Sequence, residues 1–173
     1  NQVNLLRFED QKAKSTTTAS GLQYLVTEKG DGAAVTSTSK ADVNYAVYFT
    51  DGTLLETSKL EIAEQNDIVD IARKNAGQYL PIPAEVGPEA QMIEGFKEGL
   101  RLLNEGDKAT LFVTYNLGYG EQGNRGIPPR SDLIFEVESV RFPIPTEKLQ
   151  EGALPVLCLS PEQHDRFVWH LPY

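Results

Sequence analysis

The sequence predicts an α+β fold in which a twisted antiparallel β-sheet wraps around one short α-helix. Alternating apolar and polar residues predict strands near residues 22–27, 43–49, 108–114 and 133–142. Residues 92–103 instead carry apolar side chains at helical spacing. A sheet with one apolar face must cover that face, and a single apolar helix among several strands is the natural cover.

The first strands are predicted from alternation and from a turn signal. The first strand begins at Leu22 and reaches Thr27. The second strand carries its apolar face on alternate residues: Val43, Tyr45, Val47 and Phe49. Asp51-Gly52 then predicts a two-residue hairpin, with a return strand over residues 53–57.

A helical insertion is predicted over residues 59–77. Ser58-Lys59-Leu60-Glu61 reads as a capping box, in which the serine side chain would satisfy free amides of the new helix. Apolar residues continue at helical spacing through Ala72, and Gly77 offers a stop. Two roles stay open for this insertion: packing on the flank of the domain, or forming a wall beside a ligand groove or a partner surface.

The helix predicted over residues 92–103 is the one that the sheet would cover. Its apolar face consists of Met92, Ile93, Phe96, Leu100 and Leu103. Glycine in a helix interior costs about 1 kcal/mol relative to alanine. Two glycines on this helix, at positions 95 and 99, therefore predict close contact between the helix and the sheet.

Residues 118–129 predict a turning loop without hydrolytic or phosphate-binding chemistry. Glycines recur through it and leave Tyr119 and Ile127 near its two ends. Pro128-Pro129 stops the loop and leads into the last strand, over residues 133–142. The loop lacks the Gly-Lys-Ser/Thr ending of a phosphate loop, so that interpretation is rejected.

Both ends of the chain lie outside this predicted core. Residues 1–18 are expected to form a polar tail or truncated linker, in which Leu5, Leu6 and Phe8 dock elsewhere or belong to a helix that has been cut. The domain is expected over residues 19–142. Residues 143–173 form an extension with an aromatic cluster, expected to pack on the domain or to cover another chain.

Composition excludes several classes of function. A net charge of −9 and a pI near 4.7 argue against nucleic acid as a partner. No apolar run approaches the roughly 18 residues of a membrane-spanning helix, so no transmembrane segment is expected. The single cysteine, Cys158, excludes an intrachain disulfide. With His164 and His170 it lies beyond residue 142, which leaves no nucleophilic triad or metal site within the predicted domain.

Four blocks of sequence together resemble the FKBP family of peptidyl-prolyl isomerases. They are Val43-Asn44-Tyr45, residues 51–58, residues 92–100 and residues 118–129, in that order. The resemblance covers roughly residues 19–142. It implies an FKBP-like sheet around one helix, and an isomerase acting without a cofactor on proline-containing unfolded or flexible polypeptides.

The resemblance also implies a site, position by position. Phe96 takes the place of a tryptophan that floors the family's pocket, the Ile93 amide would hold a ligand carbonyl, and the Tyr119 hydroxyl would bond the substrate carbonyl. Residues implied in catalysis are Tyr45, Glu56, Tyr119 and Phe135. Residues implied in substrate binding are Leu55, Ile82, Met92, Ile93, Phe96 and Ile127.

Several of these positions depart from the family pattern. Leu55 and Ile82 replace phenylalanines, and Asn124 stands where many relatives carry a histidine. Glu56 replaces an aspartate, which moves the carboxylate by more than about 1 Å and would misalign its hydrogen bond to Tyr45 or to a twisted substrate carbonyl. These changes imply weak isomerase activity and weak binding of the family's macrolide ligands.

Two alternatives accompany this interpretation. One is a weakly catalytic or non-catalytic FKBP-like module that binds polypeptides as a chaperone or assembly factor. The other is half of a homodimeric foldase, with a dimerisation helix preceding Asn1. Ser20-Gly21-Leu22-Gln23-Tyr24 is similar to the start of this domain in secreted bacterial members. That similarity favours the bacterial periplasm, or attachment to the outer membrane as a lipoprotein.

Overall fold

The computed structural model describes residues 1–36 and 40–140. The helices are α1 (Gln2–Ala13), α2 (Leu60–Gln65), α3 (Ile71–Asn75) and α4 (Glu94–Arg101), with a 3₁₀ turn η1 (Tyr115–Leu117). The strands are β1 (Thr16–Thr17), β2 (Gln23–Glu28), β3 (Lys40–Phe49), β4 (Leu54–Thr57), β5 (Ile82–Glu85), β6 (Lys108–Val113) and β7 (Leu133–Val140). The predicted extension over residues 143–173 lies outside the described residues, as do Cys158, His164 and His170.

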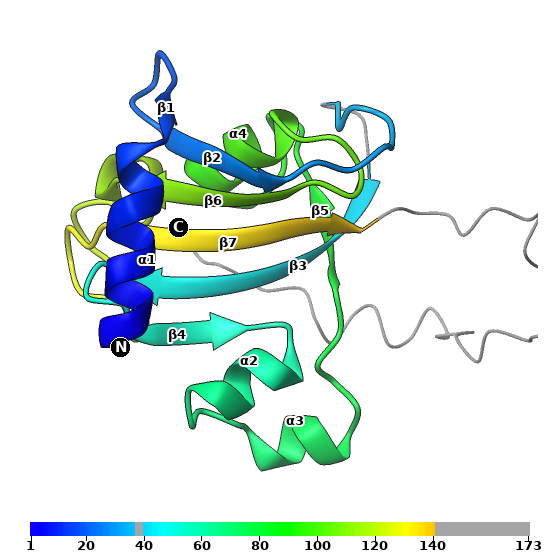
Figure 1. Cartoon of the computed structure of the whole chain (residues 1–173), viewed down its shortest axis with the longest axis vertical. Coiled ribbons are helices and arrows are strands. Elements are labelled where there is room, and N and C mark those ends of the chain that lie inside the picture. Colours follow the sequence, from blue (N-terminus) through cyan, green and yellow to red (C-terminus); the bar gives the residue numbers. More distant parts are fainter. Residues whose placement is uncertain (37–39, 141–173) are drawn as a thin grey trace, which may run out of the picture.

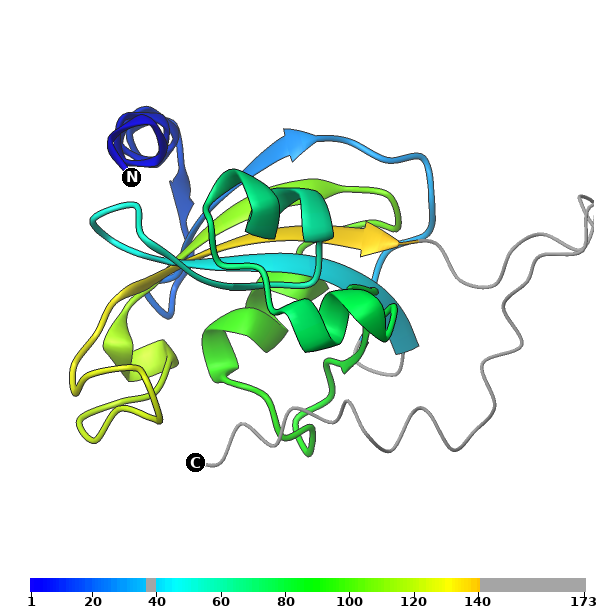
Figure 2. The ribbon, with the colours of Figure 1, turned by 90° about the horizontal axis from the view of Figure 1, so that it is seen from below.

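The strands form one antiparallel sheet of seven strands, which confirms the predicted α+β class. Their order is β1-β2-β6-β7-β3-β4, and β5 also pairs with β3. The sheet lies between two helices: α1 crosses one face, and α4 covers the other (Figures 1 and 2). None of the helices in the described ranges is long and apolar enough to span a membrane.

The α4 helix lies very close to the sheet, as its two glycines predicted. A Cβ atom built on Gly99 would lie 2.3 Å from Leu111 Cδ1, and one on Gly95 would lie 2.6 Å from Val113 Cγ1. Both distances are shorter than carbon atoms tolerate. Glycine at these positions therefore sets how closely α4 packs on β6, and Phe96 and Leu100 are buried in the resulting core.

Residues 1–18 are not the tail that the sequence analysis expected, because most of them form α1. Phe8 is only 2% exposed, and its ring packs edge-on against Tyr48 with centroids 4.9 Å apart. Arg7 lies over the Phe8 ring and forms a 2.7 Å ion pair with Glu136 of β7. The α1 helix buries one large side chain completely and exposes Leu6, so its sequence carries only a weak amphipathic pattern.

The predicted insertion is helical, but it consists of two short helices and does not begin with a capping box. The α2 helix starts at Leu60, with Lys59 as N-cap and no side-chain cap. The Ser58 hydroxyl instead accepts a hydrogen bond from the Tyr45 amide (2.9 Å) and donates one to Asn44 Oδ1 (3.0 Å). Because β4 pairs with β3, the Ser58 hydroxyl bonds to residues of β3 and does not cap α2.

The second helix of the insertion has the cap that the first one lacks. Asp70 precedes α3 and accepts a hydrogen bond from the Arg73 amide (3.0 Å). Gly77 follows the helix with a φ of +64°, so the predicted stop is confirmed.

The turn between β3 and β4 has three residues, so the two-residue hairpin prediction was wrong. The Phe49 amide donates to the Thr53 carbonyl (2.9 Å), and the Gly52 amide donates to the Phe49 carbonyl (3.0 Å). Gly52 has a φ of +84°, which is typical of the left-handed residue that closes such a loop. The glycine was recognised correctly, but the turn begins one residue earlier than expected, at Thr50.

Edge strand β5 was not predicted from the sequence. It pairs with the first half of β3 at Val43 and Ile82, whereas β4 pairs with the second half at Val47 and Glu56. The two strands therefore follow one another along the same edge of β3, and the insertion with α2 and α3 projects between them (Figure 1). This arrangement brings the insertion next to the inner face of the sheet, which is the face that α4 covers.

The packing of α1 predicts a large effect on stability from its buried ring. Phe8→Ala should lower the free energy of unfolding by about 3 kcal/mol, because it removes a buried aromatic side chain without a replacement. The matched control is Leu6→Ala on the same helix, whose side chain is 61% exposed and should change the value by less than about 0.5 kcal/mol. Urea unfolding followed by circular dichroism measures both. Equal effects would show that α1 does not dock through Phe8.

Candidate active site

A cavity of about 180 Å³ opens between α4, the inner face of the sheet and the loop after β6. Engineered apolar cavities of about 150 Å³ hold a benzene ring, so this volume accommodates the ring of a proline. The cavity is lined by Tyr45, Val47, Leu55, Glu56, Ile82, Met92, Ile93, Phe96, Tyr119, Asn124, Arg125, Ile127 and Phe135. Every site residue expected from the family resemblance is among them.

The floor of the cavity is aromatic. Phe96 of α4 and Phe135 of β7 are almost fully buried, and their ring centroids lie 5.6 Å apart at an interplanar angle of 56°. Strand register places the sheet's contribution: Val47 pairs directly with Phe135, and Tyr45 lies two residues away on the same face. Val47 was not expected in the site, although its position two residues after Tyr45 indicates that both side chains lie on the same face of the sheet.

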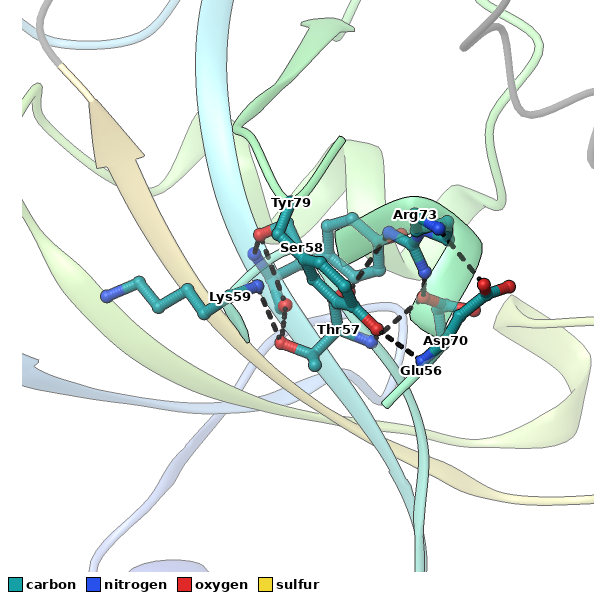
Figure 3. Close-up of polar contacts among 8 residues, drawn as sticks. Glu56, Thr57, Ser58, Lys59, Asp70, Arg73 and Tyr79 are labelled. Atoms are coloured by element: carbon teal, nitrogen blue, oxygen red, sulfur yellow. Dashed lines mark hydrogen bonds and ion pairs between the residues drawn. The ribbon is translucent and has the colours of Figure 1, made fainter. Parts of the chain in front are cut away.

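One wall of the cavity comes from the sheet edge that the insertion interrupts. Leu55 and Glu56 belong to β4, and Ile82 belongs to β5. Glu56 Oε1 accepts a hydrogen bond of 2.6 Å from Arg73 Nη1 of α3, and both side chains are about three-quarters buried, with 25% and 21% exposure (Figure 3). The misaligned bond between Glu56 and Tyr45 stays a prediction.

Arg73 is held in place from several sides. Its Nη2 donates to the Thr57 carbonyl (3.4 Å), and its guanidinium lies 4.4 Å from the centre of the Tyr79 ring. Burial alone would lower the pKa of Arg73, but the hydrogen bond and charge of Glu56 outweigh it and raise that pKa. The Tyr79 hydroxyl in turn accepts from the Asp70 amide (2.9 Å). The insertion therefore braces the wall of the cavity.

Two residues that line the cavity carry a polar group without a partner among the described residues. The Tyr119 hydroxyl makes no hydrogen bond there, and burial raises the pKa of Tyr119 from 10.0 to about 12. The phenol is therefore neutral near pH 7 and can donate. Ile93 is the N-cap of α4, so its amide has no acceptor within the helix, and none of the described residues supplies one.

The predicted glycine-rich loop holds Tyr119 and Ile127 at the cavity, as its pattern indicated. Asn124 and Ile127 exchange two backbone hydrogen bonds of 3.0 and 2.8 Å and so form a tight turn. Arg125 and Gly126 occupy the two positions inside that turn, and Gly126 has a φ of +79°. Arg125 lines the cavity but was not predicted there, because nothing in its sequence context distinguishes it from other loop arginines.

This arrangement can bind and orient a neutral ligand. The part of the chain that the structure describes contains no cluster of three or more metal-ligating side chains. It also lacks cysteine and histidine altogether. What it offers is an apolar cavity with an aromatic floor and two hydrogen-bond donors, which suits a neutral ring attached to a carbonyl group.

Comparisons with known proteins agree with this geometry. The family model described as FKBP-type peptidyl-prolyl cis-trans isomerase matches residues 32–140. A probable FKBP-type peptidyl-prolyl cis-trans isomerase FkpA of Neisseria meningitidis is 36% identical over 130 residues, which is 75% of this chain and 40% of that protein. The FKBP-type 22 kDa peptidyl-prolyl cis-trans isomerase of Escherichia coli is 34% identical over 137 residues, or 79% of this chain and 57% of that protein.

Solved structures show the same fold. The crystal structure of FkpA from Escherichia coli has a TM-score of 0.58 and 27% identity, covering 80% of this chain and 59% of that one. The chain thus spans about half the length of the curated relatives it matches. The family match covers well over half of this chain, and strands β3 to β7, helix α4 and all the residues lining the cavity lie within it. The chain belongs to the FKBP-type peptidyl-prolyl cis-trans isomerase family.

Proposed function

We propose that this chain is a peptidyl-prolyl cis-trans isomerase that takes an X-Pro segment into the cavity between α4 and the sheet. One observation carries the proposal: Tyr119, whose hydroxyl has no hydrogen-bond partner among the described residues, lines an apolar cavity floored by Phe96 and Phe135. A polar group in such a place needs a partner, and a substrate carbonyl is the partner that fits a neutral phenol.

The physical chemistry of prolyl rotation matches this site. The barrier of roughly 18–20 kcal/mol comes from amide resonance, which rotation interrupts. Water stabilises the planar polar amide more than the twisted one, so an apolar, water-poor site favours the twisted state. About 4 kcal/mol of such preference accelerates rotation roughly a thousandfold. The Tyr119 hydroxyl and the Ile93 amide would orient the carbonyls on either side, and no proton transfer or cofactor takes part.

A second candidate function is a polypeptide-binding module with little catalysis, acting as a chaperone. The aliphatic Leu55 and Ile82 in the wall favour it, because the family pattern has aromatic rings at both positions. The Glu56 carboxylate also favours it, since its ion pair with Arg73 leaves it less able to accept from a substrate. The same departures support weak binding of macrolide ligands.

The proposed substrates are proline-containing unfolded or flexible polypeptides, and the proposed place is the bacterial envelope. The segment that leads into β2, Ser20-Gly21-Leu22-Gln23-Tyr24, is similar to the start of this domain in secreted bacterial members. Curated relatives from Neisseria, Haemophilus and Escherichia support a bacterial setting. A periplasmic or lipid-anchored form and a homodimer are parts of this proposal.

Removing the Tyr119 hydroxyl should weaken the isomerase. We expect Tyr119→Phe to lower kcat/KM on an Ala-Leu-Pro-Phe peptide by about fivefold, which is the loss expected for one neutral hydrogen bond. Exchange NMR of the cis and trans peptide measures it without a coupling protease. The matched control is Tyr24→Phe on β2, which removes a hydroxyl outside the cavity and should leave kcat/KM unchanged.

Two results would decide between the candidate functions. Acceleration by the wild type that falls in Tyr119→Phe but not in Tyr24→Phe supports the isomerase. A folded wild-type protein that binds the peptide but does not accelerate exchange excludes the isomerase and leaves the binding module.

The raised pKa of Tyr119 predicts a specific pH dependence. An unfolded tyrosine ionises near pH 10, whereas burial raises the pKa of Tyr119 to about 12. Between these values the unfolded chain has lost a proton that the folded protein retains, so stability falls as pH rises from about 10 to 12. Tyr119→Phe should make that fall shallower, and absorbance at the phenolate band should show one fewer late-titrating tyrosine.

Tyr48 provides the comparison for this titration, because burial also raises the pKa of Tyr48 to about 12. Tyr48→Phe should remove a second late-titrating group independently. Isomerase activity should stay flat between about pH 6 and 9. A loss of activity near pH 8 would show that the Tyr119 phenol ionises far below its expected pKa.

A further inference from the structure

We propose that Arg125 makes this site select proline segments that carry an acidic side chain next to the proline. The proposal rests on the proposed function, since it names the substrate class of the same cavity. It starts from an exposed cation at the mouth of an apolar pocket in a chain whose net charge is −9.

The backbone of Arg125 is fixed at the edge of the cavity. It occupies the first position inside the turn closed by the hydrogen bonds between Asn124 and Ile127, at 2.8 and 3.0 Å. The Arg125 amide donates to Asn124 Oδ1 (2.7 Å), which further restrains the turn. Ile127, one residue beyond the turn, is only 8% exposed and packs into the cavity. Arg125, which is exposed and lines the cavity, is therefore held at the edge of the site by an anchored turn.

The other charges near the mouth are compensated, whereas that of Arg125 is not. Among the described residues that line the cavity, Glu56 and Arg125 carry a charge. Glu56 is paired with Arg73 at 2.6 Å. On the same loop, Glu121 is paired with Arg130 at 2.6 Å. Within residues 1–36 and 40–140, no side-chain hydrogen bond or ion pair engages the Arg125 guanidinium. The mouth thus presents one net positive charge.

A carboxylate is the group that this cation would recognise in a peptide. A guanidinium offers a planar pair of donors that matches a carboxylate in geometry and charge. The ring of the proline would occupy the aromatic floor, so a side chain within a residue of it comes within reach of the mouth. The overall negative charge of the chain does not cancel this attraction, because screening at 0.15 M salt limits the influence of distant charges to about 8 Å.

The test compares peptides that differ only in one charge. Two pairs place glutamate or glutamine directly before proline (Ala-Glu-Pro-Phe, Ala-Gln-Pro-Phe) or directly after it (Ala-Leu-Pro-Glu, Ala-Leu-Pro-Gln), with blocked ends. The readout is the Glu/Gln ratio of kcat/KM from exchange NMR, within each protein. Any general loss of activity in a variant cancels in that ratio. The proteins are wild type, Arg125→Gln, Arg125→Glu and the control Lys12→Gln.

We expect a ratio of about three for wild type in at least one pair, which lies within the range for a solvent-exposed ion pair. The ratio should fall to about one in Arg125→Gln and below one in Arg125→Glu. It should also decrease at 1 M salt, where screening acts within about 3 Å. Lys12→Gln removes the same charge from exposed α1, on the opposite face of the sheet, and should retain the wild-type ratio (Figure 2).

A wild-type ratio near one in both pairs, or an unchanged ratio in Arg125→Gln, would overturn the proposal. Failure of the proposed function looks different, because the glutamine peptides would then show no acceleration by wild type. In that case the same ratio is measured as peptide affinities by NMR titration. Equal affinities for the Glu and Gln peptides would reject the selection by Arg125, and a ratio that depends on Arg125 would support it for a binding module.

Discussion

The distance between α4 and β6 is the constraint on which the rest of this structure depends. Gly95 and Gly99 face Val113 and Leu111 so closely that even a methyl group would overlap them. This contact costs helix propensity, about 1 kcal/mol for each glycine, and it is repaid by the core that closes over the sheet. It also fixes the N-terminal end of α4, where the N-cap residue Ile93 lines the cavity. The contact that packs α4 on the sheet therefore also positions the end of the helix that lines the cavity.

The charge of Glu56 creates the second requirement, and the insertion meets it. A carboxylate in the wall of an apolar cavity is costly unless a cation compensates it. Arg73 supplies that cation from α3, and Asp70 and Tyr79 hold the helix and the guanidinium in position. The sequence analysis left two roles open for residues 59–77. The Glu56–Arg73 contact favours the second role, a wall beside the ligand groove, without making the insertion a partner surface.

What could be predicted from sequence depended on how local the determining interaction is. Strand alternation and the apolar face of α4 are local, so strands β2, β3, β4, β6 and β7, helix α4 and its glycine contacts were predicted correctly. The α1 helix was missed because its stability comes from Phe8 docking on Tyr48, a residue forty positions away. The predicted Ser58 cap was wrong for the same reason, since the Ser58 hydroxyl bonds to the neighbouring strand β3 instead. Edge strand β5 depends on pairing with β3 across the insertion, which no short pattern contains.

The candidate site shows the same division at the level of single residues. The family resemblance placed the expected residues around the cavity, since order along the chain and strand register together determine which side chains face inward. Arg125 had no such signal, because its importance comes from what surrounds it: paired charges at Glu56 and Glu121, and an anchored turn. A site that acts through polarity and shape tolerates exchange of one apolar wall residue for another, as at Leu55 and Ile82. A change in one of its few polar or charged groups alters which segments it selects, so specificity within this fold is expected to vary at positions such as Arg125 while the cavity itself persists.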